Sequence, residues 1–142
     1  MINKKWLPFL VAGIILLGGF SGYHWLMAER MDDPFILSPG NSEIIIAGKK
    51  IYADNCASCH GENLEGQPNW RQRNASGRLP APPHDETGHT WHHADKALLE
   101  LTKYGPQFVA GPNYESDMPA FDGILSDEEC NAARSFTKST LG

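Results

Sequence analysis

The stretch NCASCHG, residues 55–61, decides how this sequence folds. Its order C-x-x-C-H is the attachment site of a c-type haem. Two thiols must each add to one vinyl group of the same porphyrin, so the cysteines must lie about one helical turn apart. His60 follows directly and can present its imidazole to the iron as the proximal ligand. The stretch therefore predicts one haem c, attached through Cys56 and Cys59, with His60 as a metal ligand.

A redox-active disulfide of the thioredoxin type is the alternative for two cysteines at this spacing. That motif lies at the start of a helix that follows a strand, and no strand pattern precedes Cys56. The adjoining His60 also favours haem. Cys130 has no cysteine left to pair with once the other two bind haem. We expect it to be a small buried apolar side chain, with an intermolecular disulfide as the alternative.

Three segments of residues 42–142 have helical patterns. The first follows a cap at Asn41 or Ser42 and continues at helical spacing with Ile45, Gly48, Ile51, Tyr52 and Asn55. The second spans about Ala94 to Tyr104 and ends at Gly105-Pro106, with inward positions Leu98 and Leu101, and with Ala97 and Thr102 as further candidates. The third begins at a capping box of Ser126 and Glu129, and its apolar stripe is Cys130, Ala133, Phe136 and Thr137.

The segments between these helices, 61–91 and 107–125, have the composition of loops, and there is little sign of strand. Three short helices bury little apolar surface, and long loops need a reason to be ordered. The sequence therefore predicts an all-α domain whose missing core is supplied by the covalent haem.

The N-terminal run WLPFLVAGIILLGGFSGYHWLMA, residues 6–28, contains no Asp, Glu, Lys or Arg. About twenty apolar residues are what a helix needs to cross a bilayer. Two lysines precede the run, which predicts a cytoplasmic tip over 1–5 and export of the residues after the run. A cleaved signal peptide is the alternative, but the run is long and lacks a clean small-x-small exit. We expect a single-pass inner-membrane anchor over 6–28, a tether over 29–41, and a domain over 42–142 facing the periplasm or cell exterior.

The charge is distributed unevenly along the chain. Residues 29–142 carry all 17 acidic residues and 10 of the 12 basic ones, a net charge of about −7. Nucleic-acid phosphates require a basic face, so we expect no nucleic-acid partner. The sequence also lacks paired carboxylates for acid–base work, a phosphate-binding loop and a nucleophile–base pair, so we expect neither an enzyme nor a small-molecule substrate.

Several motifs occur together in the order of one known family. They are IAGKKIYADNCASCHGENLEG at 46–66, SDMPAF at 116–121 and LSDEECNAARSFTKSTL at 125–141. From about Ile44 to Leu141 the sequence thus resembles the class I monohaem cytochromes c. The stretch GRLPAPPHDETGHTWHHADKALLELTKYG, 77–105, is further similar to a membrane-anchored bacterial subset. The resemblance implies the cytochrome c fold, with three main helices wrapped around a covalent haem, here with one N-terminal transmembrane helix.

Met118 is the only one of the four methionines that follows the haem motif. Its segment resembles the family's methionine-ligand loop, and a thioether opposite His60 leaves the iron no open position. A histidine among residues 84–93 is the main alternative ligand, although those residues precede the middle helix. The other interpretation of Met118 is a loop residue packed on apolar neighbours. We predict His60 and Met118 as the two iron ligands.

Other residues near the haem follow from the resemblance. Family cytochromes hold the second nitrogen of the proximal histidine with a backbone carbonyl in a proline-containing loop. Here Gln67-Pro68 or the proline run 79–83 can supply that carbonyl, and we favour the run near Pro80. Contact with the haem propionates is a further possibility for Trp91, Trp70 and Arg78, and core packing is the alternative for the tryptophans. We include Trp91 among the predicted cofactor-binding residues.

Four histidines lie in the segment HDETGHTWHH, namely His84, His89, His92 and His93. Three of them at positions i, i+3 and i+4 of one helix would make a metal site. However, the helix is expected to start only near Ala94. We therefore expect these residues to serve as scaffolding, with His92 or His93 capping the middle helix, and we keep metal binding by the group as the alternative.

These features predict a membrane-anchored cytochrome that passes single electrons between a donor and an acceptor protein of a respiratory chain. The first alternative is a haem c subunit of a multi-chain membrane oxidase or dehydrogenase complex. The second is a haem sensor or weak peroxidase with an open iron position, which an intact Met118 loop disfavours.

Overall fold

The structure, a computed structural model, describes residues 18–25 and 36–141. The chain divides into two compact units, Met1–Asp33 and Pro34–Gly142. The predicted tip lies outside the described residues, as do most of the predicted anchor and the first part of the tether. Residues 18–25 are helical and exposed. Within the described residues, no helix has both the length and the apolar character needed to cross a membrane.

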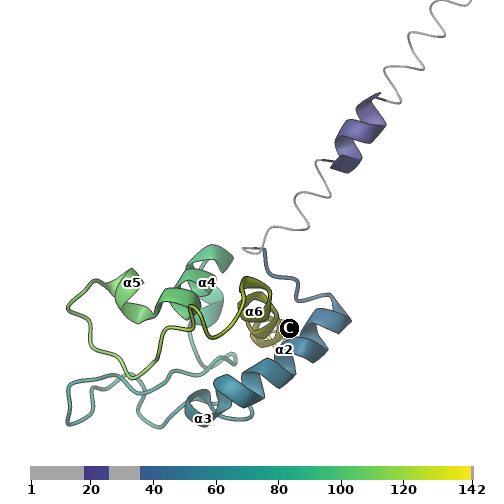
Figure 1. The fold of residues 1–142 in the computed structure, drawn as a ribbon. Helices are drawn as coiled ribbons and strands as arrows, with labels where there is room; N and C mark the ends of the chain where they lie inside the picture. The colour runs from purple at the N-terminus through teal and green to yellow at the C-terminus, as the bar shows by residue number, and fades with distance from the viewer. Residues whose placement is uncertain (1–17, 26–35, 142) are drawn as a thin grey trace, which may run out of the picture. The chain divides into compact units, whose positions relative to one another are not determined.

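The second unit is helical, and its described residues include no strand (Figure 1). Its elements are α2 (Ser42–Asn55), α3 (Ala57–His60), a 3₁₀ turn η1 (Thr90–His92), α4 (Asp95–Tyr104), α5 (Pro106–Ala110) and α6 (Asp127–Ser139). All three predicted helices are present, and long irregular segments join them. This arrangement agrees with the predicted all-α class.

The caps of α2 and α6 follow from local sequence. Asn41, rather than Ser42, caps α2, because its side-chain oxygen accepts hydrogen bonds from the N–H groups of Glu43 and Ile44 at 3.0 and 3.3 Å. The capping box of α6 is confirmed in both directions. Ser126 accepts from the Glu129 N–H at 3.2 Å, and the Glu129 carboxylate accepts from the Ser126 N–H at 2.8 Å.

The region around α4 differs from the prediction in two ways. Ala94 stands at the N-cap of α4 and no side-chain cap is present, so the prediction that His92 or His93 caps this helix is wrong. The prediction of a loop over 107–125 is wrong for its first residues, because they belong to α5, which begins directly after α4. Gly105 adopts a φ of +83°, which ends α4, and Pro106 is preorganised for the first turn of a new helix.

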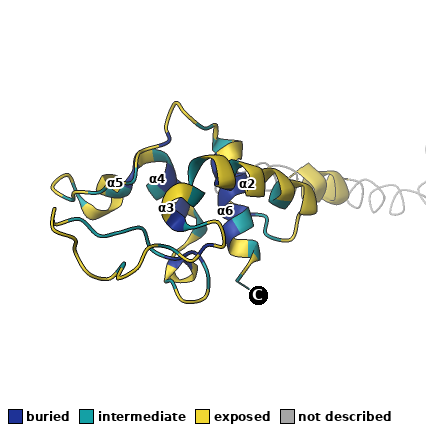
Figure 2. Cartoon of the chain, turned by 90° about the horizontal axis from the view of Figure 1, so that it is seen from below, coloured by how far each residue is buried: buried dark blue, intermediate teal, exposed yellow. Residues whose placement is uncertain are grey.

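Helices α2 and α6 cross at close range and form the main helix pair of the unit (Figures 1 and 2). Gly48 makes this crossing possible, since a Cβ atom there would lie 1.9 Å from the carbonyl oxygen of Ala132. One turn later the buried ring of Tyr52 packs on Phe136, with ring centroids 5.5 Å apart. Gly48 and Tyr52 therefore lie where α2 crosses α6.

The apolar core beside this crossing is small. Leu37, Leu99, Phe121 and Cys130 form one buried cluster, and Met118 and Leu125 pack against it. Leu98 and Thr102 are buried as predicted, but Leu99 is buried where Leu101 was expected and Leu101 is only half-buried. Leu99 packs with Leu37, Phe121 and Cys130, whereas Leu98 lines a small hollow with Arg134 and Thr137 of α6.

Candidate haem site

The C-x-x-C-H stretch forms a single helical turn. Cys56 ends α2 and its carbonyl accepts hydrogen bonds from the N–H groups of Cys59 and His60, at 3.1 and 2.9 Å. Both cysteines have free thiols; Cys56 is half-buried and Cys59 is exposed. Two free thiols one turn apart are what attachment to a single porphyrin requires. This arrangement fits covalent haem and gives no support to a disulfide between them.

The His60 side chain is buried at 7% exposure and held in a defined orientation. Its Nδ1 lies 2.8 Å from the carbonyl oxygen of Pro82. Because a carbonyl oxygen only accepts, Nδ1 carries the proton and Nε2 keeps the lone pair that can bind iron. Burial lowers the pKa of His60, which keeps the ring neutral near pH 7. The predicted role of the proline run 79–83 is confirmed over that of Gln67-Pro68.

A backbone ladder brings Pro82 to His60 across 22 residues of sequence. The Gln67 N–H donates to the Ala81 carbonyl at 2.9 Å, and the His84 N–H donates to the Leu64 carbonyl at 2.8 Å. Gly66 permits this approach with a φ of +68°, since a Cβ atom there would lie 2.4 Å from the Pro83 backbone nitrogen. The two segments therefore clamp the turn that carries His60.

His84 is the main residue at this site whose role the sequence did not reveal. It is buried at 8% exposure, and its ring stacks on that of His60 with centroids 4.1 Å apart. Its Nδ1 lies 2.8 Å from the Thr90 hydroxyl, and its Nε2 lies 3.5 Å from Nη1 of Arg134. The available signal in the sequence was that His84 follows Pro82 by two residues. Only the fold shows that the His84 side chain is buried.

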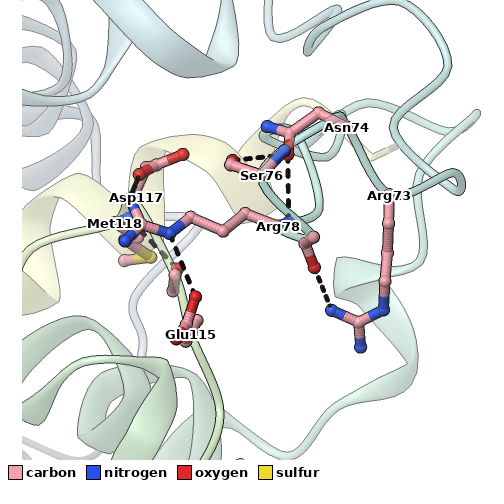
Figure 3. A network of polar contacts seen from close by, with 9 residues as sticks. Arg73, Asn74, Ser76, Arg78, Glu115, Asp117 and Met118 are labelled. Carbon is pink, nitrogen blue, oxygen red and sulfur yellow. Dashed lines mark hydrogen bonds and ion pairs between the residues drawn. The ribbon is translucent and has the colours of Figure 1, made fainter.

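Met118 lies in the loop before α6, half-buried and packed against the core cluster. Its backbone N–H donates to the Ser116 hydroxyl at 3.1 Å. Arg78 forms ion pairs with Asp117 and, at 3.7 Å, with Glu115 (Figure 3). Arg78 thus ties the 73–78 loop to the methionine loop, a contact the sequence did not predict.

The two tryptophans considered near the haem are stacked on histidines. Trp91 is 54% exposed and lies on His92 with ring centroids 3.5 Å apart. Trp70 is half-buried, stacks on His89 at 5.3 Å and carries the Arg71 guanidinium 4.0 Å above its ring. The role of Trp91 at the haem stays a prediction.

The four histidines of 84–93 occupy separate environments. His84 is interior, His92 lies on Trp91, and His89 and His93 meet edge to face at 5.3 Å. They do not share a helix face, because η1 ends at His92 and α4 begins at Asp95. Nowhere in the described parts of the chain do three His, Cys, Asp or Glu side chains group as a metal site would need.

The protein part of the core leaves apolar side chains uncovered. Phe108 and Val109 of α5 are 58% and 56% exposed, whereas the buried apolar cluster of the described residues consists of Leu37, Leu99, Phe121 and Cys130 alone. Such a fold fits a bound apolar group that completes its core. Together with the free thiols and the available nitrogen of His60, these features fit haem c.

Comparison with known proteins agrees with this geometry. The cytochrome c family model matches residues 45–140. The Cbb3-type cytochrome c oxidase subunit FixP of Bradyrhizobium diazoefficiens is 24% identical over 118 residues, covering 82% of this chain and 36% of that protein. The subunit of the same name from Bradyrhizobium sp. (strain ORS 278) is 29% identical over 96 residues, covering 68% of this chain and 27% of that protein.

The chain spans about a third of the length of the curated relatives it matches. No solved structure gives a significant match. The family match extends over more than half of the chain and includes the C-x-x-C-H turn, the clamping loop and α6. The chain therefore belongs to the cytochrome c family and carries haem c bound covalently through Cys56 and Cys59.

Proposed function

We propose that this protein is a membrane-anchored electron carrier with His60 and Met118 as its axial haem ligands, acting in a respiratory chain. Haem iron changes between its ferric and ferrous states and so supplies the transfer of one electron. The observation that carries the proposal is the buried His60 ring, fixed to the Pro82 carbonyl beside two free thiols. This hydrogen bond orients Nε2 and makes it a better donor to a metal.

The Met118 loop supports a closed, six-coordinate site. The side chain packs on the core cluster, and the ion pairs of Arg78 hold the loop on either side of Ser116. A thioether opposite histidine raises the reduction potential and leaves no position for an external ligand. Electron transfer, and not ligand binding, is the chemistry that such a pair serves. Trp91 is proposed to pack at the haem edge.

Anchoring and partners complete the proposal. Residues 6–28 form the membrane anchor, which keeps the domain at the outer face of the inner membrane. The partners are a redox protein that donates the electron and another that accepts it. Their interfaces are expected to be small and transient, as is usual for electron-transfer encounters.

A specific observation favours a second candidate, a haem c subunit of a multi-chain oxidase. Both Bradyrhizobium relatives are named as subunits of a Cbb3-type cytochrome c oxidase. Purification of the full chain from its native membrane in mild detergent separates the two candidates. A free carrier migrates alone, whereas an oxidase subunit migrates with large partner chains and with their oxidase activity.

Replacing Met118 by Ala tests the axial ligand. We expect the weak near-infrared Met–iron band of the ferric protein to disappear and the reduced protein to bind carbon monoxide, because the sixth position opens. Absorption spectra of both oxidation states, with and without carbon monoxide, measure this.

Met31→Ala is the control for Met118→Ala and should retain the band and exclude carbon monoxide. A wild-type protein that is high-spin and binds carbon monoxide would instead support a sensor or peroxidase. An unchanged spectrum in Met118→Ala would rule out Met118 as the ligand and favour a histidine among residues 84–93.

A further inference from the structure

A buried cation lies in the interior of the domain. Arg134 belongs to α6 and is only 7% exposed. It occupies the inward stripe of that helix with Cys130, Ala133 and Thr137, all of which are buried. Burying a charge is costly unless a partner compensates it, so such a residue needs an explanation.

None of the ion pairs found among the described residues includes Arg134. The charge of Asp95 offsets part of the cost of burying Arg134, but the Asp95 carboxylate is itself paired with Lys138. Its Nη1 contacts a neutral acceptor, Nε2 of His84, at 3.5 Å, and its buried Nε has no hydrogen-bond partner. Burial lowers the pKa of Arg134 to about 10, so the guanidinium stays charged at neutral pH. The interior therefore holds a positive charge that has no ion-pair partner among the described residues.

His84 links this charge to the proximal histidine. The hydrogen bonds run in one direction: Arg134 donates to His84 Nε2, His84 Nδ1–H donates to Thr90, and the Thr90 hydroxyl donates to the Pro83 carbonyl at 3.4 Å. The His84 ring in turn stacks on that of His60 at 4.1 Å. A single imidazole thus separates the guanidinium from the residue that holds the iron.

We propose that Arg134 sets the redox potential of the haem, as a fixed positive charge that favours the ferrous state. When the ferric haem takes one electron from a donor, the charge of the site falls by one and no bond to a protein ligand forms or breaks. A nearby cation in a low-dielectric interior is repelled less by the ferrous site than by the ferric site. The inference rests on His60 as the axial ligand under the proposed function.

The test compares midpoint potentials in the full-length haem-loaded protein. Arg134→Met removes the charge at similar volume, and Arg134→Lys keeps it. Arg73→Met is the matched control, since Arg73 is exposed and hydrogen-bonded to the Gly77 carbonyl. Spectroelectrochemical titration measures the ferrous-to-ferric ratio at each applied potential.

We expect Arg134→Met to lower the ferrous-to-ferric ratio at a fixed potential about tenfold, which is about 59 mV for a one-electron couple. Arg134→Lys should have a midpoint potential close to that of the wild type. Arg73→Met should change the midpoint potential little, because water and salt screen an exposed charge. The Met–iron band must persist in each variant, so that a lost ligand is not mistaken for a lost charge. An unchanged potential in Arg134→Met overturns the proposal.

Charge compensation provides a second route that keeps Arg134 in place. Thr137 lies three residues along α6 and lines the same small hollow as Arg134. Thr137→Glu should neutralise the guanidinium and lower the midpoint potential of the haem, as Arg134→Met does. Thr137→Gln, which adds no charge, should leave the potential unchanged. Arg134→Met and Thr137→Glu could both fail to attach haem, and the outcome then depends on Arg134→Lys. If Arg134→Lys also fails to attach haem, Arg134 is needed for folding and the proposal is overturned. A wild-type protein without a haem spectrum would contradict the proposed function instead.

Discussion

The double variant Cys56→Ala, Cys59→Ala is expected to lose all covalently bound haem. Each thiol supplies one bond to the porphyrin, and the helical turn places no other free thiol beside them. The third cysteine, Cys130, is buried and its burial raises the pKa of the thiol to about 11, so it is a poor nucleophile. Haem staining of the denatured protein on a gel, with mass spectrometry of the intact chain, measures attachment.

The same variant should also lose much of its ordered structure. The buried apolar cluster of the protein is small, so a covalently bound haem is expected to supply much of the core. A ligand that binds only the folded state stabilises that state. Far-ultraviolet circular dichroism should therefore show reduced helicity. Cys130→Ala is the control and should keep both haem and helicity; if it loses haem instead, the assignment of the attachment sites is wrong.

Gly48→Ala is expected to destabilise the haem-loaded protein by about 3 kcal/mol, at the upper end of overpacking effects. In an isolated helix the same change would stabilise the helix by about 1 kcal/mol. A loss of stability would therefore indicate that Gly48 lies at a close helix crossing. The new Cβ would lie 1.9 Å from the Ala132 carbonyl oxygen, and relief requires α2 and α6 to separate. Chemical denaturation followed by circular dichroism gives the free energy of unfolding.

Gly40 provides a matched control for this glycine. A Cβ atom there would meet nothing within 4 Å, and Gly40 does not have a positive φ. Gly40→Ala should therefore change the free energy of unfolding by less than about 0.5 kcal/mol. Equal stability of Gly48→Ala and the wild type would mean that the two helices do not cross at the observed distance.

Features that depend on local chemistry could be read directly from the sequence. The spacing of Cys56, Cys59 and His60 places all three on one helical turn, because hydrogen bonds within four residues set that geometry. The capping box of Ser126 and Glu129 is equally local, and the structure has it as predicted. Gly48 and Tyr52 share one face of α2 because they are four residues apart, but it is the structure that places this face against α6.

Other features depend on which distant segments meet, and spacing along the chain carries little information about that. Two proline-containing segments could hold His60, and only the ladder between residues 64–67 and 81–84 selects the Pro82 carbonyl. The start of α5 was missed because Gly105-Pro106 stops one helix and also begins the next.

The sequence by itself determined the cofactor, the covalent attachment and the three main helices, since each rests on residues within a few positions of one another. Tertiary structure alone decided what surrounds His60. His84 lies in a polar loop and Arg134 in a helix with many charged neighbours, so neither looks interior in sequence. Packing of that loop against α6 buries both and places a positive charge one imidazole away from the proximal histidine.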